Sequence, residues 1–252
     1  MGQMTVSVVT VCLNAARDIE RSMRSVLEQT HPDIDYVVVD GGSTDGTTGI
    51  VEKHRPRIAS FISEADRGLY HAMNKGVARA RGDVVFFLNA DDYLIDSQVL
   101  SDITAAFADG SAPDIVYGDL CWDIRGERVP CRQPDMVTRR FLAARTILHQ
   151  SLFVKRNLFD LIGPFAEDLK VVGDYEWLLR ASRTPALRWR HLRRDVSVMN
   201  TGGVSWQSNW EAERLRVMRR YFRPDEILFY RTIPQYFRNL RRRVRAWTGR
   251  TP

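Results

Sequence analysis

The alternation of strand-like and helix-like segments over the first 120 residues most constrains what this chain can fold into. Five apolar runs have the β-branched composition of buried strands, and they lie at 5–13, 35–40, 58–63, 83–88 and 114–119. Helical periodicity fills the first interval, where Ile19, Met23, Val26 and Leu27 fall on one face. Strands that alternate with helices predict an α/β fold with a doubly wound, mostly parallel sheet.

Polar residues follow each expected strand. They are Asn14, then Asp40, Gly41 and Gly42, then Glu64 and Asp66, then Asp91 and Asp92, then Gly118 and Asp119. Ligands of such sheets bind beyond the carboxyl ends of the strands. We therefore expect a crevice there, lined with carboxylates and glycines.

The segment LNADD at 88–92 places two adjacent acids directly after the most apolar strand. Neighbouring carboxylates repel each other unless a positive group lies beside them. A divalent cation with oxygen ligands is the usual partner. The alternative is a surface loop that carries solvated acids, and these residues alone leave both open.

Length and composition bound the class of protein. The chain has 252 residues, 44% of them hydrophobic, which fits one α/β domain with or without an appendage. No apolar run approaches the ~18 residues of a membrane-spanning helix, and we expect no signal peptide at the N-terminus. Three cysteines without CxxC spacing favour a reduced cytoplasmic protein with neither disulfides nor a zinc site.

The net charge of +6 is concentrated near the C-terminus. Residues 231–252 contain seven arginines and no acid, whereas the rest of the chain carries 30 Lys and Arg against 31 Asp and Glu. A nearly neutral body argues against nucleic-acid binding. Apolar residues of the tail fall on one helical face, which is typical of a helix on an anionic membrane surface. A helix packed on the core and a disordered end are the alternatives.

After residue 120 the pattern is less regular. We expect loops over 121–151, helices at 150–163, 173–183 and 209–222, a strand pair at 186–192 and 196–199, and a flexible loop at 202–205. The irregular stretch suits loops that face a substrate.

Four ordered motifs carry a resemblance to a known family. They read SVVTVCLN, VVVDGGSTDGT, DRGLYHAMNKGVARARGD and FLNADD. The second alone is a tight turn, since it contains neither a Walker GK[ST] nor GxGxxG and fails as an EF-hand loop. Together the four resemble family 2 glycosyltransferases, in particular the subgroup that builds bacterial surface polysaccharides and glycolipids. The resemblance is dense over 5–120 and looser over 149–205.

The resemblance implies a GT-A fold. Its Rossmann-like, nucleotide-sugar-binding half would span 1–120, a smaller acceptor-binding and catalytic part 121–222, and a helical basic tail 223–252. It implies an inverting, metal-dependent transferase that moves a sugar from a UDP-, dTDP- or GDP-sugar to a hydroxyl of a glycan or lipid-linked acceptor. Donor contacts are implied for Thr10, Asn14, Asp40, Arg67, Gly68, Asn74, Lys75 and Ala90, with Asp40 resembling the acid that binds the nucleobase.

The segment NADD occupies the place of the family's DxD motif. This implies Mn²⁺ or Mg²⁺ between the protein and the two donor phosphates. Asp91 is the expected main ligand and Asp92 its support. Asn89 stands where the family has the first acid, so the site has one charge fewer.

Asp174, at the start of the helix expected at 173–183, is implied as the base that takes the proton of the acceptor hydroxyl. The family often has an acidic pair here, and Gly173 replaces its first member. A plain N-cap is the alternative role, with Glu176 favouring the helix dipole. Four further residues are candidates for contacts with the acceptor or diphosphate: His149, Gln150, Gly203 and Ser205.

Two other functions stay open. A sugar-nucleotide pyrophosphorylase uses a similar sheet, but LNAARDIERS stands where that class has GxGxRxxPxT. A degenerate, non-catalytic nucleotide-sugar-binding or membrane scaffold would also explain Asn89 and Gly173. With its basic tail, the transferase reading predicts a cytoplasmic protein that is peripheral on the inner face of the plasma membrane.

Overall fold

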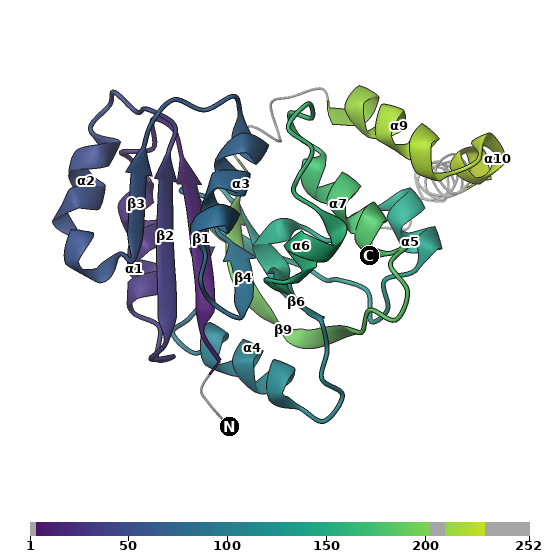
Figure 1. The fold of residues 1–252 in the computed structure, drawn as a ribbon, viewed down its shortest axis with the longest axis horizontal. Helices are drawn as coiled ribbons and strands as arrows, with labels where there is room; N and C mark the ends of the chain where they lie inside the picture. The colour runs from purple at the N-terminus through teal and green to yellow at the C-terminus, as the bar shows by residue number, and fades with distance from the viewer. Residues whose placement is uncertain (1–3, 202–209, 230–252) are drawn as a thin grey trace, which may run out of the picture.

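The computed structural model of the chain describes residues 4–201 and 210–229. One sheet runs through it in the order β3-β2-β1-β4-β8-β6-β9-β5, with β7 paired to β6 (Figure 1). The strands are β1 (Val6–Cys12), β2 (Ile34–Asp40), β3 (Ser60–Ser63), β4 (Val84–Phe87), β5 (Tyr93–Leu94), β6 (Ile115–Ile124), β7 (Glu127–Cys131), β8 (Leu152–Lys155) and β9 (Trp189–Asn200).

The described helices follow the strands in the alternation that the sequence predicted. They are α1 (Ile19–Leu27), α2 (Thr47–Lys53), α3 (Leu69–Arg79), α4 (Val99–Ala108), α5 (Arg139–Ala144), α6 (Leu158–Ile162), α7 (Gly173–Ala181), α9 (Trp210–Tyr221) and α10 (Pro224–Ile227). Two short 3-10 helices are η1 (Arg55–Arg57) and η2 (His149–Ser151).

Alternation along the central strands builds two cores. Successive strand residues point to opposite faces of a sheet, so Val9 and Val37 pack in one apolar cluster with α3 and α7. Val8 and Val38 pack in the other cluster, with α1 and α4. Figure 1 shows α3 and α1 on opposite faces of β1 and β2. The predicted doubly wound α/β fold is confirmed.

The sheet is mostly parallel, as expected. β1 pairs in parallel with β2 and β4, β2 with β3, and β6 with β9. β8 lies antiparallel between β4 and β6, so β4 and β6 point the same way. The carboxyl ends of β1, β2, β3 and β4 therefore meet at one edge.

The helix predicted at 150–163 is wrong in its first part. Leu152–Lys155 forms β8, which pairs with β4 through Val85 and Val154, and only Leu158–Ile162 is helical. Gly163 ends that helix with a φ of +95°, in the region that favours glycine. A four-residue apolar run reads equally well as strand or helix, and the open edge of β4 decides for a strand.

Two further expectations after residue 120 also need correction. The strand pair expected at 186–192 and 196–199 is one continuous strand, β9, with irregular register beside Gly118 and Asp119. The stretch 121–151 contains the β6–β7 hairpin and α5 as well as loops.

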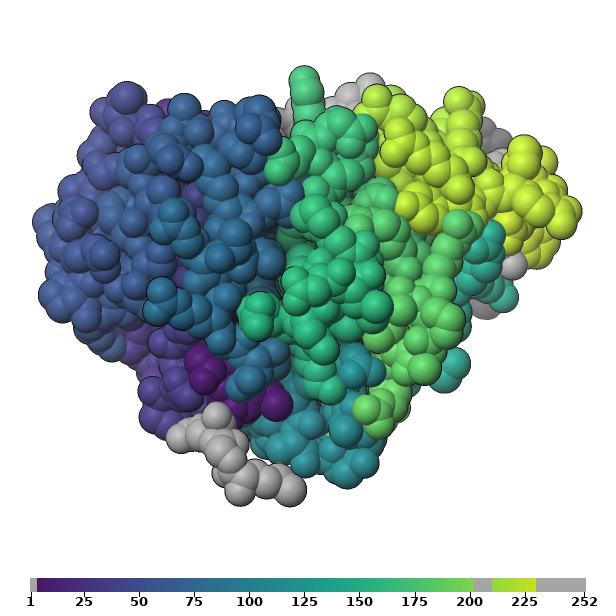
Figure 2. Space-filling view, in the orientation of Figure 1, coloured from purple at the N-terminus to yellow at the C-terminus, as the bar shows by residue number. Residues whose placement is uncertain are grey.

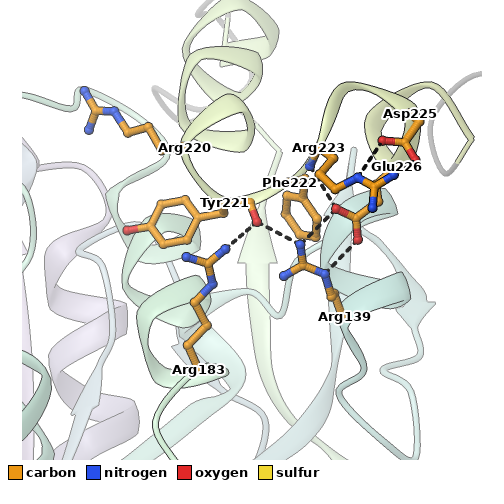
Figure 3. Close-up of a pocket in the computed structure, with 8 residues that line it drawn as sticks. All are labelled: Arg139, Arg183, Arg220, Tyr221, Phe222, Arg223, Asp225 and Glu226. Atoms are coloured by element: carbon orange, nitrogen blue, oxygen red, sulfur yellow. Dashed lines mark hydrogen bonds and ion pairs between the residues drawn. The ribbon is translucent and has the colours of Figure 1, made fainter.

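The last described helices, α9 and α10, form one end of the molecule (Figure 2). Arg139 of α5 holds them: its guanidinium bonds to both carboxylate oxygens of Glu226 at 2.9 and 3.0 Å and to the Tyr221 carbonyl at 2.8 Å. Arg183 donates to the same carbonyl (Figure 3). These side chains line a surface pocket. Because they bond to one another, we interpret the pocket as a packing contact between helices.

Within the described residues, no helix is both long enough and apolar enough to cross a membrane. The basic segment 231–252 and the loop at 202–205, with Gly203 and Ser205, lie outside the described residues. The expectations for them stay predictions.

Candidate functional site

Asp40 ends β2 and holds the loop that follows. Its fully buried carboxylate accepts the backbone N–H groups of Gly42 at 3.1 Å and Ser43 at 2.9 Å, and the hydroxyls of Ser43 and Ser63. Burial by itself would raise the pKa of Asp40, but these hydrogen bonds lower it below its usual value. Both oxygens are thus engaged by the protein, and a contact with a nucleobase stays a prediction.

The loops after β1 and β2 are joined to each other. Asn14, at a φ of +50°, accepts the Thr44 N–H at 3.0 Å, and Asp45 accepts the N–H groups of Ala16 at 2.9 Å and Thr47 at 3.0 Å. These bonds lower the pKa of Asp45. Asp45 therefore orders the loop and bonds to Thr47, the first residue of α2.

Thr10 lies deeper than the sequence suggested. Strand β1 continues to Cys12, so Thr10 is inside the sheet, fully buried, with its hydroxyl 3.1 Å from that of Tyr36. In this structure it supports the sheet beneath the crevice and does not line it.

The motif around α3 brings the other predicted donor residues to the same edge. Gly68 donates its N–H to Asp66 at 2.9 Å. Arg67, a largely exposed side chain, pairs with Glu167. Asn74 donates to Glu167 and to the Phe165 carbonyl, each at 3.0 Å, and Lys75 pairs with Glu64 at 2.9 Å. The first half is thereby tied to the segment 165–167.

Asp91 and Asp92 follow β4 at this edge, immediately after the buried Ala90. Asp92 is 1% exposed and accepts the Gln150 side-chain amide and the Asn200 N–H, both at 2.9 Å. Burial raises the pKa of both acids, and the charge of Asp91 raises that of Asp92 further. Within the described chain, neither carboxylate forms an ion pair with Lys or Arg.

The residues present fit a divalent cation shared with a ligand. No other residue that the structure describes hydrogen-bonds to the Asp91 carboxylate, and the Asn89 side-chain oxygen is buried without a partner there. The described residues hold no cluster of three or more His, Cys, Asp or Glu arranged for a metal. Mg²⁺-type ions bind through one or two carboxylates plus substrate phosphates, which matches this composition.

Arg21 of α1 also belongs to this site, and sequence reasoning missed it. Its guanidinium donates to the Asp91 carbonyl at 3.2 Å and stacks over Tyr93, 4.3 Å from the ring centroid. Its charge lowers the pKa of Asp91. Nothing in the sequence marks an arginine on the polar face of a helix as part of a site 70 residues away.

Asp174 begins the first turn of α7, where the sequence placed the base. One carboxylate oxygen accepts the Tyr175 N–H at 2.7 Å and lies 3.2 Å from the Tyr70 hydroxyl, whose shorter hydrogen bond, at 2.6 Å, goes to the Val171 carbonyl. The other oxygen lies 3.0 Å from His149 Nδ1. Burial and the charge of Asp174 raise the pKa of Tyr70 well above its usual value. The phenol thus stays protonated and able to donate.

Gly173 is explained by the same tyrosine. A Cβ at Gly173 would lie 2.7 Å from the Tyr70 ring, so the ring occupies the place of a larger side chain. Tyr70 lies within the motif GLYHAMNKG. Its contact with a residue 104 positions away gives no local signal.

His149 and Gln150 are neighbours in η2 and bond to two different acids. His149 contacts Asp174, and Gln150 donates to Asp92. The Gln150 carbonyl accepts the Ser197 hydroxyl at 2.5 Å, which fixes the turn. The dipeptide His149–Gln150 therefore links the candidate base, Asp174, to the candidate metal ligand, Asp92.

A pocket of about 450 Å³ adjoins Asp174 and is lined also by Tyr70, His149 and Gln150. Most of its lining comes from residues 121–222, with Leu69 and Tyr70 from α3, and the loop residues that Asp40 binds do not line it. The carboxyl edge thus carries a carboxylate pair, a separate carboxylate at a helix start, and an open pocket between the two halves of the chain.

Comparison with known proteins gives this arrangement a family. A glycosyltransferase of PGL/p-HBAD biosynthesis from Mycobacterium tuberculosis is 34% identical over 203 residues, which cover 79% of this chain and 78% of the relative. The structure of S. aureus TarS 1–349 is similar with a TM-score of 0.70 and 26% identity, over 89% of this chain and 66% of that one. The same TarS segment in complex with UDP gives a TM-score of 0.67 at 25% identity.

The likeness to TarS agrees with the GT-A fold expected from the sequence. The sequence model of glycosyl transferase family 2 matches residues 7–165, which include both loops after β1 and β2, the carboxylate pair and His149. The protein is a glycosyltransferase that belongs to family 2.

Proposed function

We propose that the protein transfers a sugar, with inversion and with a divalent metal, from a nucleoside diphosphate donor to a hydroxyl of a glycan or lipid-linked acceptor in bacterial surface glycan synthesis. The relative from M. tuberculosis, named for PGL/p-HBAD biosynthesis, supports the surface glycolipid setting. The complex of TarS with UDP supports a nucleoside diphosphate donor. UDP-, dTDP- and GDP-sugars are the candidates.

The observation that carries the proposal is the carboxylate pair of Asp91, which is half-buried, and Asp92, which is buried. Two adjacent acids with raised pKa values, and no ion pair in the described chain, lack the positive charge that would stabilise them. A bound Mn²⁺ or Mg²⁺ would stabilise the charge that develops on the leaving diphosphate. Asp91 would be the main ligand and Asp92 its support.

Asp174 would accept the proton of the attacking hydroxyl. The acceptor oxygen bonds to the anomeric carbon of the donor sugar while the bond from that carbon to the diphosphate breaks on the opposite face. Tyr70 and His149 hold the carboxylate from both sides, so its orientation is set before the acceptor binds. Fixed orientation of a base is one of the larger sources of rate enhancement.

We further propose a cytoplasmic location on the inner face of the plasma membrane. The support is the sequence of residues 231–252, with seven arginines, no acid and one apolar helical face. Deletion of 231–252 should abolish sedimentation of the protein with anionic vesicles. Unchanged sedimentation would remove the proposed membrane contact.

The first test is thermal unfolding with UDP, dTDP or GDP, each with and without Mn²⁺. A ligand at about 100 times its dissociation constant adds about 2.7 kcal/mol to the free energy of unfolding. We expect one nucleotide to give such a shift only with Mn²⁺, and Asp91→Ala to remove it. Asp160→Ala is the matched control, because Asp160 is exposed in α6, which follows β8 at the opposite edge of the sheet.

Turnover separates the transferase from the alternatives. Release of the nucleoside diphosphate from the identified donor, dependent on acceptor and on Asp174, would support transfer. Binding without turnover would favour the non-catalytic scaffold, and no shift with any nucleotide would contradict the donor site itself.

A further inference from the structure

The pocket beside Asp174 has two kinds of wall. Most of its surface is apolar: Trp122, Leu148, Cys131 and Met199 come from the β6–β7 side, and Leu69, Tyr70 and Val172 come from α3 and the start of α7. The first group belongs to a small apolar cluster of its own. A volume of about 450 Å³ is that of a small-molecule site.

Four charged side chains also line this pocket: Arg145, Lys170, Asp174 and Arg214. Three nearly buried side chains add further polarity. Gln133, His149 and Gln150 are 7%, 8% and 1% exposed. Each keeps one polar atom without a partner in the described chain: Oε1 of Gln133, Nε2 of His149 and Oε1 of Gln150. Buried polar atoms are rarely left unpaired in native proteins, so three in one pocket indicate groups that a ligand completes.

In each of these side chains, the atom that is already hydrogen-bonded shows which atom is left to bond a ligand. Gln150 donates its NH₂ group to Asp92 at 2.9 Å, so its carbonyl oxygen is the unpaired atom, and a carbonyl oxygen accepts. His149 places Nδ1 3.0 Å from Asp174, so Nε2 is the ring nitrogen left for a ligand. Gln133 directs its NH₂ group to the Cys131 sulfur, 3.8 Å away, and leaves a carbonyl oxygen.

We infer that the part of the acceptor that enters this pocket is a sugar ring. Two carbonyl oxygens and one ring nitrogen call for several hydrogen-bonding groups, which the hydroxyls of a sugar supply around an apolar C–H face that suits Trp122 and Tyr70. A phenol or simple alkyl alcohol brings one hydroxyl, and that hydroxyl is the reacting group. The inference rests on the proposed function, which allows a glycan or a lipid-linked acceptor. In either case, we infer that the reacting end of the acceptor is a saccharide.

With this acceptor, every bond and proton of the transfer can be accounted for. One ring hydroxyl oxygen bonds to the anomeric carbon of the donor sugar, the bond from that carbon to the diphosphate oxygen breaks with its electron pair on the diphosphate, and the hydroxyl proton goes to Asp174. The remaining hydroxyls hydrogen-bond to Gln133, His149 and Gln150.

The test is saturation-transfer NMR on the full chain with UDP and Mn²⁺ present. The probes are the methyl glycosides of glucose, galactose, mannose and rhamnose, with phenol and cyclohexanol as compounds that have a single hydroxyl. We expect at least one glycoside to bind, and phenol and cyclohexanol not to displace it at equal concentration. Gln133→Leu should weaken that glycoside about tenfold, the effect of one lost hydrogen bond.

Met199→Leu is the matched control, because it keeps an apolar wall of similar volume and removes no polar atom. Both variants should retain the Mn²⁺-dependent UDP shift, which shows that they fold. Binding of phenol or cyclohexanol in place of every glycoside would overturn the inference. If no probe binds while the UDP shift persists, the pocket holds water only and the inference fails without the proposed function. The absence of a Mn²⁺-dependent shift with any of UDP, dTDP and GDP in the unmodified chain contradicts the proposed function instead.

Discussion

The donor side and the acceptor side of the carboxyl edge are built in opposite ways. On the donor side, Asp40 and Asp45 use their carboxylates to bind N–H groups and hydroxyls of the loops themselves. On the acceptor side, Gln133, His149 and Gln150 keep polar atoms that no described residue satisfies. The acids of the two donor loops are therefore paired within the protein, whereas the polar atoms of the acceptor side are not.

This difference follows from where the partners come from. The donor loops lie beside each other because β1, β2 and β3 are parallel neighbours, so their polar groups find partners across the strand ends. The acceptor side is assembled from η2, the β6–β7 hairpin and the start of α7, which meet around a pocket. A space between separate elements leaves polar groups for a substrate to complete.

Loss of the base should have the largest effect. Asp174→Asn keeps the shape and an oxygen for the Tyr70 and Tyr175 donors, but an amide cannot take the proton. We expect the rate of transfer to fall about 10²- to 10⁴-fold, measured with the donor that the nucleotide shifts identify. The UDP–Mn²⁺ shift should persist. A loss of less than about tenfold would assign the base to another residue.

On the donor side, the expected effect is on stability. Asp40→Asn replaces two accepting oxygens with one oxygen and an NH₂ group that faces donors of Ser43 and Ser63. We expect the free energy of unfolding in urea to fall by about 2–4 kcal/mol. Asp123→Asn is the control, since Asp123 accepts a single N–H from Gly126, and it should change stability by about 0.5 kcal/mol or less. Equal losses in the two variants would mean that Asp40 does not hold the loop.

The contact between Gly173 and Tyr70 joins the two sides. Gly173→Ala would place a Cβ 2.7 Å from the Tyr70 ring, which is 1% exposed. We expect a loss of about 1–3 kcal/mol in thermal unfolding and a lower transfer rate, because Tyr70 positions Asp174. Adding Tyr70→Leu should recover stability but not activity. A Gly173→Ala protein as stable as the unmodified one would contradict the packing argument.

The smallest effect, a pH dependence, should have opposite signs for the loop acid Asp40 and the expected metal ligand Asp92. The pKa of Asp40 is lowered by folding, so its stabilisation is present above the ordinary carboxyl pKa of about 4 and is lost as pH falls through the lowered value. The pKa of Asp92 is raised, so without metal its charge destabilises the fold as pH rises above about 4.

Urea unfolding at a series of pH values checks both signs. Relative to the unmodified chain, Asp40→Asn should lose most at neutral pH and converge with it in acid. Asp92→Asn should gain stability, relative to the unmodified chain, as pH rises. Parallel curves for the two variants would show that folding does not shift the pKa values of Asp40 and Asp92 in opposite directions.

The sequence by itself determined the first half of the protein. β-Branched runs separated by helical periodicity predicted β1, β2, β3 and β4 within a residue or two, since side-chain alternation and helix periodicity are local properties. The motifs through NADD indicated the family that the comparisons confirm. Asp91, Asp92 and Asp174 could be named because the family resemblance implied roles for acids at these places, directly after a strand and at the start of a helix.

Only the tertiary structure decided the second half and the partners of the named acids. Leu152–Lys155 is a strand because β4 and β6 offer their edges to it, and a strand depends on hydrogen bonds to residues distant in sequence. The burial of Thr10 was also decided by packing, since its hydroxyl lies 3.1 Å from that of Tyr36 on the neighbouring strand β2. Tyr70, Arg21 and Gln133 reached the site from other elements, since folding, and not local sequence, brings such side chains within hydrogen-bonding distance.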